Sequence, residues 1–210
     1  MSIHEEAIVA HVTEITIWTR GVTKDKEGRD VANGIAAAAD KEGKFTQAFD
    51  NYVDLPDRVN VPLRKYARIS NQEIEMRYDY ENEHPEVVVL VDATIVKGMN
   101  ILRGVQKDGI LVVNTDRSPE EILKFIPDKK PLKAIACVNA SAICGDATVD
   151  FSGSEGGIDT AGLGAGLAAP MLGAFAKATK LVKIESLAEV VQNKQALQKG
   201  FETCSVKVLN

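Results

Sequence analysis

Three short runs of apolar residues place the strongest constraint on the fold of this chain. Residues 86–91, 110–114 and 132–139 are almost continuously apolar, which is typical of strands buried on both faces of a parallel sheet. Parallel strands need long crossover connections, and residues 97–105 and 119–125 have the make-up of helices that would supply them. The pattern therefore predicts an α/β fold with a doubly wound, mainly parallel sheet.

The N-terminal half adds a further strand and some antiparallel structure. Residues 12–18 alternate with the period of a strand, and the alanine-rich residues 30–41 predict the helix that follows. A second short strand is expected over residues 45–49. Residues 64–70 and 73–78 both have extended character and are separated by two polar residues, which predicts an inserted antiparallel hairpin.

Helices are expected at the C-terminal end of the chain. Pro170 can open a helix because its missing N–H would have no partner in the first turn. A second helix is expected from Ser186, since Glu189 follows at the spacing of a capping box.

Composition limits the class of protein. With 210 residues, 45% hydrophobic and 26% charged, the chain can bury one sizeable core, and a single domain spanning residues 1–210 is expected. The net charge of -5 argues against a nucleic-acid partner, which would need clustered lysine and arginine in excess. No apolar stretch approaches the length of a membrane span or a signal peptide, so a cytoplasmic protein without a membrane span is expected.

The residues that usually carry chemistry are scattered. Cysteine is odd in number and lacks C-x-x-C spacing, so neither a disulfide framework nor a zinc or iron–sulfur site is expected in this chain. Cys137 lies in an apolar run and is expected to be a buried hydrophobic residue. No Walker loop, H-E-x-x-H motif or nucleophile–base pair is visible, so the chain alone is expected not to be catalytic.

Two neighbouring segments match the pattern of a known family. Residues 56–70 read Pro-Asp-Arg-Val-Asn-Val-Pro-Leu-Arg-Lys-Tyr-Ala-Arg-Ile-Ser, against the family's Pro-Glu-Arg-Arg-Gly-Ala-Pro-Val-Arg-Ala-Phe-Val-Arg-Ile-Ser, without a gap. Residues 42–49 read Glu-Gly-Lys-Phe-Thr-Gln-Ala-Phe, against Asp/Glu-Gly-Lys-Tyr-Val-Gln-Ala-Phe. Residues 87–94, 108–115 and 171–191 continue the match in the same order. In these segments the chain resembles the gamma subunit, or gamma domain, of the 2-oxoacid:ferredoxin oxidoreductases.

The resemblance implies a subunit of a complex that oxidatively decarboxylates a 2-oxoacid to an acyl-CoA. In this family thiamine diphosphate and Mg²⁺ are held by alpha and beta subunits, and [4Fe-4S] clusters by beta or delta subunits. No cofactor is then expected in this chain itself, and coenzyme A would be a shared substrate. The implied partners are alpha, beta and delta-type subunits and, through the complex, ferredoxin or another acceptor. The implied substrate is pyruvate or a less usual, for example aryl, 2-oxoacid.

A site for the phosphates of coenzyme A is expected after the first strand, where doubly wound folds bind anions. The family has Gly-Arg-Gly-Gly-Gln-Gly there, of which this chain keeps Arg20 and Gly21. Residues 19–30 read as a longer, charged loop in which Lys24, Lys26 and Arg29 could hold an anion by charge. The alternative is that this is a plain solvated loop.

Arginines on a stiff segment are expected to face another subunit. Arg58 and Arg64 match family positions, and Pro62 restricts the backbone between them. The alternative is a set of local salt bridges from these arginines to Asp54, Asp57 or Glu75.

A glycine-rich stretch, residues 152–166, precedes the helix at Pro170 and is favoured as an interface loop over a nucleotide site, because it follows no clear strand. For the whole chain, the alternative to a gamma subunit is a free-standing anion- or nucleotide-binding module of doubly wound fold.

Overall fold

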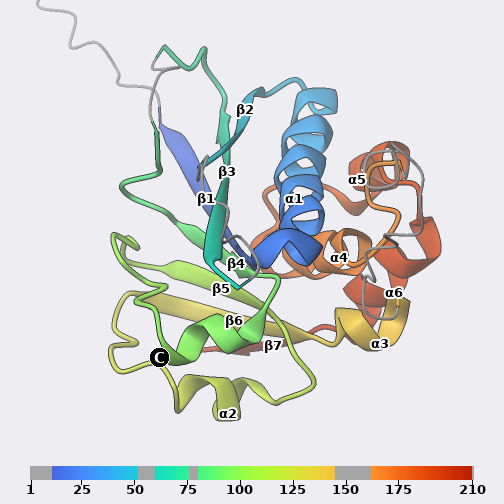
Figure 1. The fold of residues 1–210 in the computed structure, drawn as a ribbon. Coiled ribbons are helices and arrows are strands. Elements are labelled where there is room, and N and C mark those ends of the chain that lie inside the picture. The colour runs from blue at the N-terminus through green and yellow to red at the C-terminus, as the bar shows by residue number, and fades with distance from the viewer. Residues whose placement is uncertain (1–10, 52–59, 76–79, 145–161, 210) are drawn as a thin grey trace, which may run out of the picture.

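The structure is a computed structural model that describes residues 11–51, 60–75, 80–144 and 162–209 (Figure 1). Within these residues seven strands form one sheet in the order β2-β3-β1-β4-β5-β6-β7. Four central strands are parallel: β1 (Val12–Arg20), β4 (Val87–Leu90), β5 (Gly109–Asn114) and β6 (Leu132–Val138). Antiparallel strands form the two edges: β2 (Phe45–Asp50) and β3 (Pro62–Ser70) on one side, β7 (Ser205–Val208) on the other.

Helices cover both faces of the sheet, which confirms the α/β, doubly wound prediction (Figure 1). On one face lie α1 (Gly21–Lys41), α3 (Ala140–Cys144), α4 (Ala168–Thr179), α5 (Ile184–Val190) and α6 (Lys194–Thr203). The other face carries the short 3-10 helix η1 (Ala93–Lys97) and α2 (Pro119–Leu123). None of the helices in the described ranges is long and apolar enough to cross a membrane.

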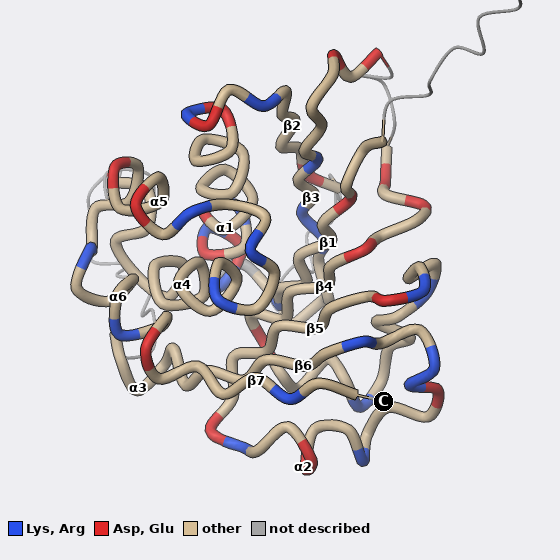
Figure 2. Tube along the Cα trace, turned by 180° about the vertical axis from the view of Figure 1, so that it is seen from behind, with Lys and Arg blue, Asp and Glu red and all other residues tan. Residues whose placement is uncertain are grey.

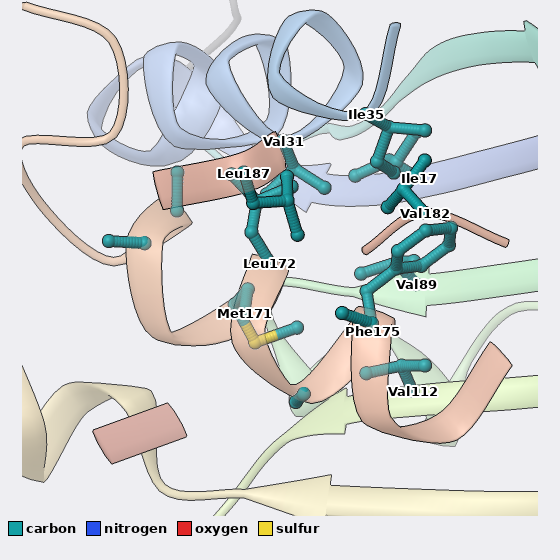
Figure 3. Packing of buried hydrophobic residues seen from close by; sticks show 14 of the residues in the cluster. Ile17, Val31, Ile35, Val89, Val112, Met171, Leu172, Phe175, Val182 and Leu187 are labelled. Atoms are coloured by element: carbon teal, nitrogen blue, oxygen red, sulfur yellow. The ribbon is translucent and has the colours of Figure 1, made fainter. Parts of the chain in front are cut away.

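The larger core lies between the sheet, α1 and α4 (Figure 3). Phe175, Leu172 and Met171 of α4 are fully buried against α1 and the central strands. On its outer side α4 crosses α6 at Gly173 and Gly200, where a Cβ atom on either glycine would collide with the backbone of the other helix. Gly173 and Gly200 therefore permit α4 and α6 to pack with their backbones in contact.

The charged stretch after β1 is a helix, so the prediction of a loop over residues 19–30 was wrong. Gly21 takes a positive φ of 64°, which lets the chain turn from β1 directly into α1. Oppositely charged pairs at i, i+4 then stabilise the first turns: Asp25 with Arg29, and Lys26 with Asp30. That spacing was the sequence signal for the earlier helix start.

Two other local predictions, the helix over residues 97–105 and the hairpin of residues 64–70 with residues 73–78, differ from the structure. Residues 98–104 form turns rather than a helix, and Gly104 has a φ of 77° and touches the Glu83 backbone. β3 pairs with β1 and β2, while residues 73–75 lie in no strand and residues 76–79 fall outside the described ranges.

The second C-terminal helix, α5, begins two residues before Ser186, at Ile184. Its N-terminus is capped by the Glu42 carboxylate, which accepts the Lys183 N–H at 2.6 Å. Burial of Glu42 opposes its charge, but the hydrogen bonds from Lys183 and Lys44 outweigh burial and lower its pKa.

Candidate functional site

The carboxyl ends of the parallel strands form a polar cavity of about 390 Å³. This is the edge of a doubly wound sheet at which ligands bind in general. The polar lining comes from α1 and from the segments that follow β4, β5 and β6: Lys24, Asp92, Thr94, Asn114, Thr115, Asp116, Arg117, Asn139 and Ser141, with Lys97 at one end.

Asn114 ties three strand ends together at the floor of this cavity. Its side-chain amide donates to the Val91 carbonyl oxygen at 3.0 Å and to the Ser141 hydroxyl at 3.3 Å, and its oxygen accepts the Ala140 N–H at 3.0 Å. The residue is buried, so these bonds are shielded from competing water. The strand ends are thereby held at fixed spacing.

Asp92 holds a lysine at the mouth of the cavity. Its carboxylate accepts hydrogen bonds from the N–H and hydroxyl of Thr94, at 2.8 and 2.6 Å, and lies 3.3 Å from the Lys24 ammonium. Burial opposes the charge on Asp92, but Thr94 and Lys24 outweigh burial and lower the pKa of the carboxyl. Lys24 keeps donors beyond the one that Asp92 occupies, so it can also contact an anion in the cavity.

The structure separates Lys24 from the other two cations of the expected anion site. Lys26 pairs with Asp30 at 2.6 Å, and Arg29 contacts Asp25 at 2.9 Å and Asp50 at 3.2 Å. The two carboxylates around Arg29 also flank the buried Lys65, at 2.7 and 3.0 Å. Lys26 and Arg29 therefore belong to ion pairs of α1, β2 and β3, while only Lys24 of the three lines the cavity.

Arg20 and Gly21 lie at the junction of β1 and α1. Arg20 donates to the Asn60 carbonyl oxygen at 2.9 Å, and the Gly21 N–H to the Val61 carbonyl oxygen at 3.0 Å. The side chain of Arg20, the N-cap residue of α1, makes no capping hydrogen bond, and no acidic residue lies in the first turn. The helix terminus beside Lys24 is thus electrostatically suited to an anion.

Arg64 is held on the face of the sheet opposite α1. Its guanidinium lies over the rings of Trp18 and Tyr66, 5.5 and 5.9 Å from their centres, and pairs with Glu81 at 2.8 Å. The side chain stays 27% exposed. Arg64 thus forms a local salt bridge, as the alternative expectation held, but its partner is Glu81 and not Asp54, Asp57 or Glu75.

Of the other residues expected at this interface or in its alternative salt bridges, the structure describes only some. Pro62 opens β3 opposite Arg20 of β1. Arg58, Asp54 and Asp57 lie outside the described residues.

The described part of the glycine-rich stretch packs on two acidic residues of α1. Glu27 accepts the Ala168 N–H at 2.7 Å, and Asp30 accepts the Gly164 N–H at 3.1 Å. Gly166 lies so close to the Glu27 carboxylate that a Cβ atom there would collide with it. A carboxylate of the chain itself therefore occupies the N-terminus of α4, where a nucleotide phosphate would otherwise bind.

Two of the three cysteine thiols lie in the core. Cys137 and Cys204 are buried, as expected for Cys137, and burial raises their pKa values to about 12 and about 11. Within the described ranges no three histidine, cysteine or acidic side chains gather as they would around a metal ion.

The sequence also contained an unused signal for this site. Asp92, Asn114 and Asn139 each lie within two residues of the end of an apolar strand, which is where a parallel sheet presents ligand-binding side chains. Of the residues that line the cavity, Lys24 was a candidate from the sequence, but these three were not.

A family model and individual relatives point to the same protein family. Residues 28–204 match the family model described as pyruvate ferredoxin/flavodoxin oxidoreductase. The chain is 36% identical over 163 residues to the "Pyruvate/ketoisovalerate oxidoreductases common subunit gamma" of Pyrococcus furiosus, covering 77% of each chain. It is 31% identical over 183 residues to the "Pyruvate synthase subunit PorC" of Thermotoga maritima, covering 80% of this chain and 83% of the relative.

Solved structures show the same similarity. The crystal structure of the pyruvate oxidoreductase subunit PORC of Thermotoga maritima superposes with a TM-score of 0.67 at 28% identity, covering 93% of this chain and 98% of that one. A keto/oxoacid ferredoxin oxidoreductase gamma subunit of Geobacter sulfurreducens has the same fold, with a TM-score of 0.62 at 16% identity.

Proposed function

The chain belongs to the pyruvate ferredoxin/flavodoxin oxidoreductase family, and on this basis we propose that it is the gamma subunit of a 2-oxoacid oxidoreductase complex. The observation that carries the proposal is the match to gamma and PorC chains over more than three quarters of both partners. The complex would convert a 2-oxoacid to an acyl-CoA and pass the electrons to ferredoxin or another acceptor. Pyruvate is the proposed substrate, since relatives are named for pyruvate and ketoisovalerate.

The chemistry would take place on the partner subunits. Thiamine diphosphate with Mg²⁺ would supply the decarboxylation there, and iron–sulfur clusters the electron transfer. This chain would form one domain that assembles with alpha, beta and delta-type subunits in the cytoplasm. This chain itself would bind one of the substrates and would contact the catalytic subunits in the assembled complex.

Coenzyme A is the substrate proposed to contact this chain. Its phosphates are anionic, and Lys24, near the N-terminus of α1, lines the polar cavity. Arg20 and Gly21 would set the position of that terminus. Lys26 and Arg29, which are already paired with carboxylates, would support it indirectly.

The surface around Pro62 and Arg64, with Arg58, is proposed as a contact with the catalytic subunits. The Arg64 guanidinium is already held by Trp18, Tyr66 and Glu81, so little conformational entropy would be lost on docking. A preorganised, partly exposed arginine is a frequent centre of binding energy in protein interfaces.

The experiment is co-expression of this chain with the alpha, beta and delta-type subunits, followed by size-exclusion chromatography and a coenzyme A-dependent assay with pyruvate. We expect co-elution with the larger subunits, and loss of acyl-CoA formation when the chain is omitted. Elution of the chain alone as a monomer or homodimer, with full activity in the remaining subunits, would contradict the proposal and favour a free-standing module.

A further inference from the structure

A second, more apolar groove lies beside the polar cavity. It has a volume of about 430 Å³ and runs between residues 96–102 and residues 125–128. Phe125 in its lining is half-buried, and Met99 at the rim is 44% exposed. The buried lining residues are Val96, Ile101, Leu102 and Ile126. An exposed methionine above a buried apolar lining is typical of a surface that accepts a side chain of another protein.

The surroundings of this groove are basic although the chain is acidic. Residues 97–133 contain eight lysines and arginines and five acidic residues. In the whole chain the acidic residues are in excess, with 30 against 25 lysines and arginines. Figure 2 shows lysine and arginine positions near β6, α2 and the end of the chain. The exposed lysines nearest in sequence to the groove form no salt bridge with any described residue: Lys97, Lys124, Lys129 and Lys130.

Phe125 orients part of this charge. Its ring contacts two cations, with the Lys97 nitrogen 5.4 Å and the Arg117 guanidinium carbon 5.5 Å from the ring centre. Cation–π contact keeps both charges at the edge of the apolar lining without neutralising them. The groove therefore offers an apolar slot with Lys97 and Asp128 in its lining, and Lys124, Lys129 and Lys130 near lining residues in the sequence add an excess of positive charge.

We propose that this groove is a docking site for an acidic segment of a catalytic partner subunit, which inserts one large apolar side chain between Met99 and Phe125. Carboxylates on either side of that anchor would pair with the rim lysines, and such pairing sets register and association rate. The proposal rests on the subunit role proposed above.

The groove also lies on the same face of the sheet as the Arg64 surface. Val96, in its lining, belongs to the apolar cluster that contains Trp18, on which Arg64 stacks. One partner can therefore contact both.

The first test places a photo-cross-linking residue, benzoylphenylalanine, at Met99 in the assembled complex. The control is the same residue at Lys199, an exposed position on α6 on the other side of the sheet. We expect position 99 to cross-link to an acidic peptide of a catalytic subunit. A cross-link only to a second copy of this chain, to nucleic acid or to no partner would overturn the proposal.

The second test reverses charge on the rim. Lys124→Glu combined with Lys129→Glu should weaken association with the catalytic subunits about tenfold or more at low salt, and less at high salt. Lys199→Glu is the matched control and should have no effect. Equal association of the double variant and the control, or a changed KM for coenzyme A with unchanged association, would overturn the proposal. The unaltered chain is run in parallel, and its failure to associate would refute the subunit assignment instead.

Discussion

The Glu27 carboxylate accepts the backbone N–H of Ala168 at 2.7 Å, so that a residue of α1 caps α4 from 141 positions away in the sequence. The contact places a negative charge at the N-terminus of α4, where the helix dipole stabilises it. It also requires Gly166, because the carboxylate occupies the space of a Cβ atom. The cap thereby fixes the start of α4 against the first half of α1.

Replacing Glu27 by Gln should change how stability depends on pH. Burial raises the pKa of Glu27 above 4.5, with a further contribution from Asp30, despite the Ala168 hydrogen bond. A raised carboxyl pKa gives stability that is present below the unfolded pKa and lost as pH rises through the folded pKa. The melting temperature of Glu27→Gln minus that of the native chain should therefore increase from pH 4 to pH 7. The exposed Glu189→Gln serves as control, and a difference that does not vary with pH would contradict the prediction.

Gly166→Ala should destabilise the chain by about 1–3 kcal/mol, because the new methyl group displaces the Glu27 carboxylate. Gly98→Ala is the matched control, since a Cβ atom there meets open space and its φ of −130° suits any residue. Urea unfolding of both variants gives the comparison. Similar midpoints for the two would show that the contact between Gly166 and Glu27 is not needed for stability.

Thiol titration should distinguish one cysteine from the other two. With pKa values of about 12 and about 11, buried Cys137 and Cys204 stay protonated at pH 8, whereas Cys144 is partly exposed. A disulfide reagent should modify only Cys144 in the folded chain and all three in urea. Cys144→Ser should abolish the reaction in the folded state; continued reaction there would indicate that a core cysteine opens to solvent.

Lys24→Ala should raise the KM of the assembled enzyme for coenzyme A by about threefold to tenfold and leave the KM for the 2-oxoacid unchanged. The paired variant Lys26→Ala with Arg29→Ala should lower the melting temperature instead, because it breaks ion pairs of α1. Steady-state kinetics with each substrate in turn makes the distinction. If the paired variant changed the coenzyme A KM and Lys24→Ala did not, the anion would bind outside the cavity.

Arg64→Ala should weaken association with the catalytic subunits by about 2–5 kcal/mol if a partner carboxylate becomes buried there. The fold of the free chain should lose about 1 kcal/mol or less, since the pair with Glu81 is partly exposed. Arg64→Lys keeps the charge but loses the guanidinium contact with Trp18. Its affinity for the catalytic subunits should therefore lie between that of the native chain and that of Arg64→Ala. A pull-down with thermal melting of the free chain measures both effects, and full complex recovery by Arg64→Ala would remove this residue from the interface.

The sequence contained enough to predict the fold class but only part of the site. The apolar runs that became β4, β5 and β6 are a local pattern, and the parallel sheet follows from them. Ser118 and Glu121 likewise form the capping box that local spacing suggests. Such features depend on neighbours in the chain.

The features that could not be predicted depend on distant residues. Glu42 caps α5 and Glu27 caps α4, in each case from 141 positions away. The charged composition of residues 21–30 indicated a loop, although their i, i+4 charge spacing favoured a helix. The ion pairs of that helix with Asp50 and Lys65, by contrast, join residues that are distant in the sequence. Lys24 was identified, but its separation from Lys26 and Arg29 is a property of helix geometry that only the structure shows.

The crossing of α4 and α6 at Gly173 and Gly200 links the helical layer on one face of the sheet to the edge strand β7. Because the backbones touch there, α6 must follow any shift of α4, and α6 leads straight into β7. Lys207 of β7 is in turn paired with Glu120 of α2, on the face that carries the apolar groove. The close approach at Gly173 and Gly200 therefore fixes where α6 ends and β7 begins, so a larger side chain at either glycine would disturb the β7 edge of the sheet as well as the helix pair.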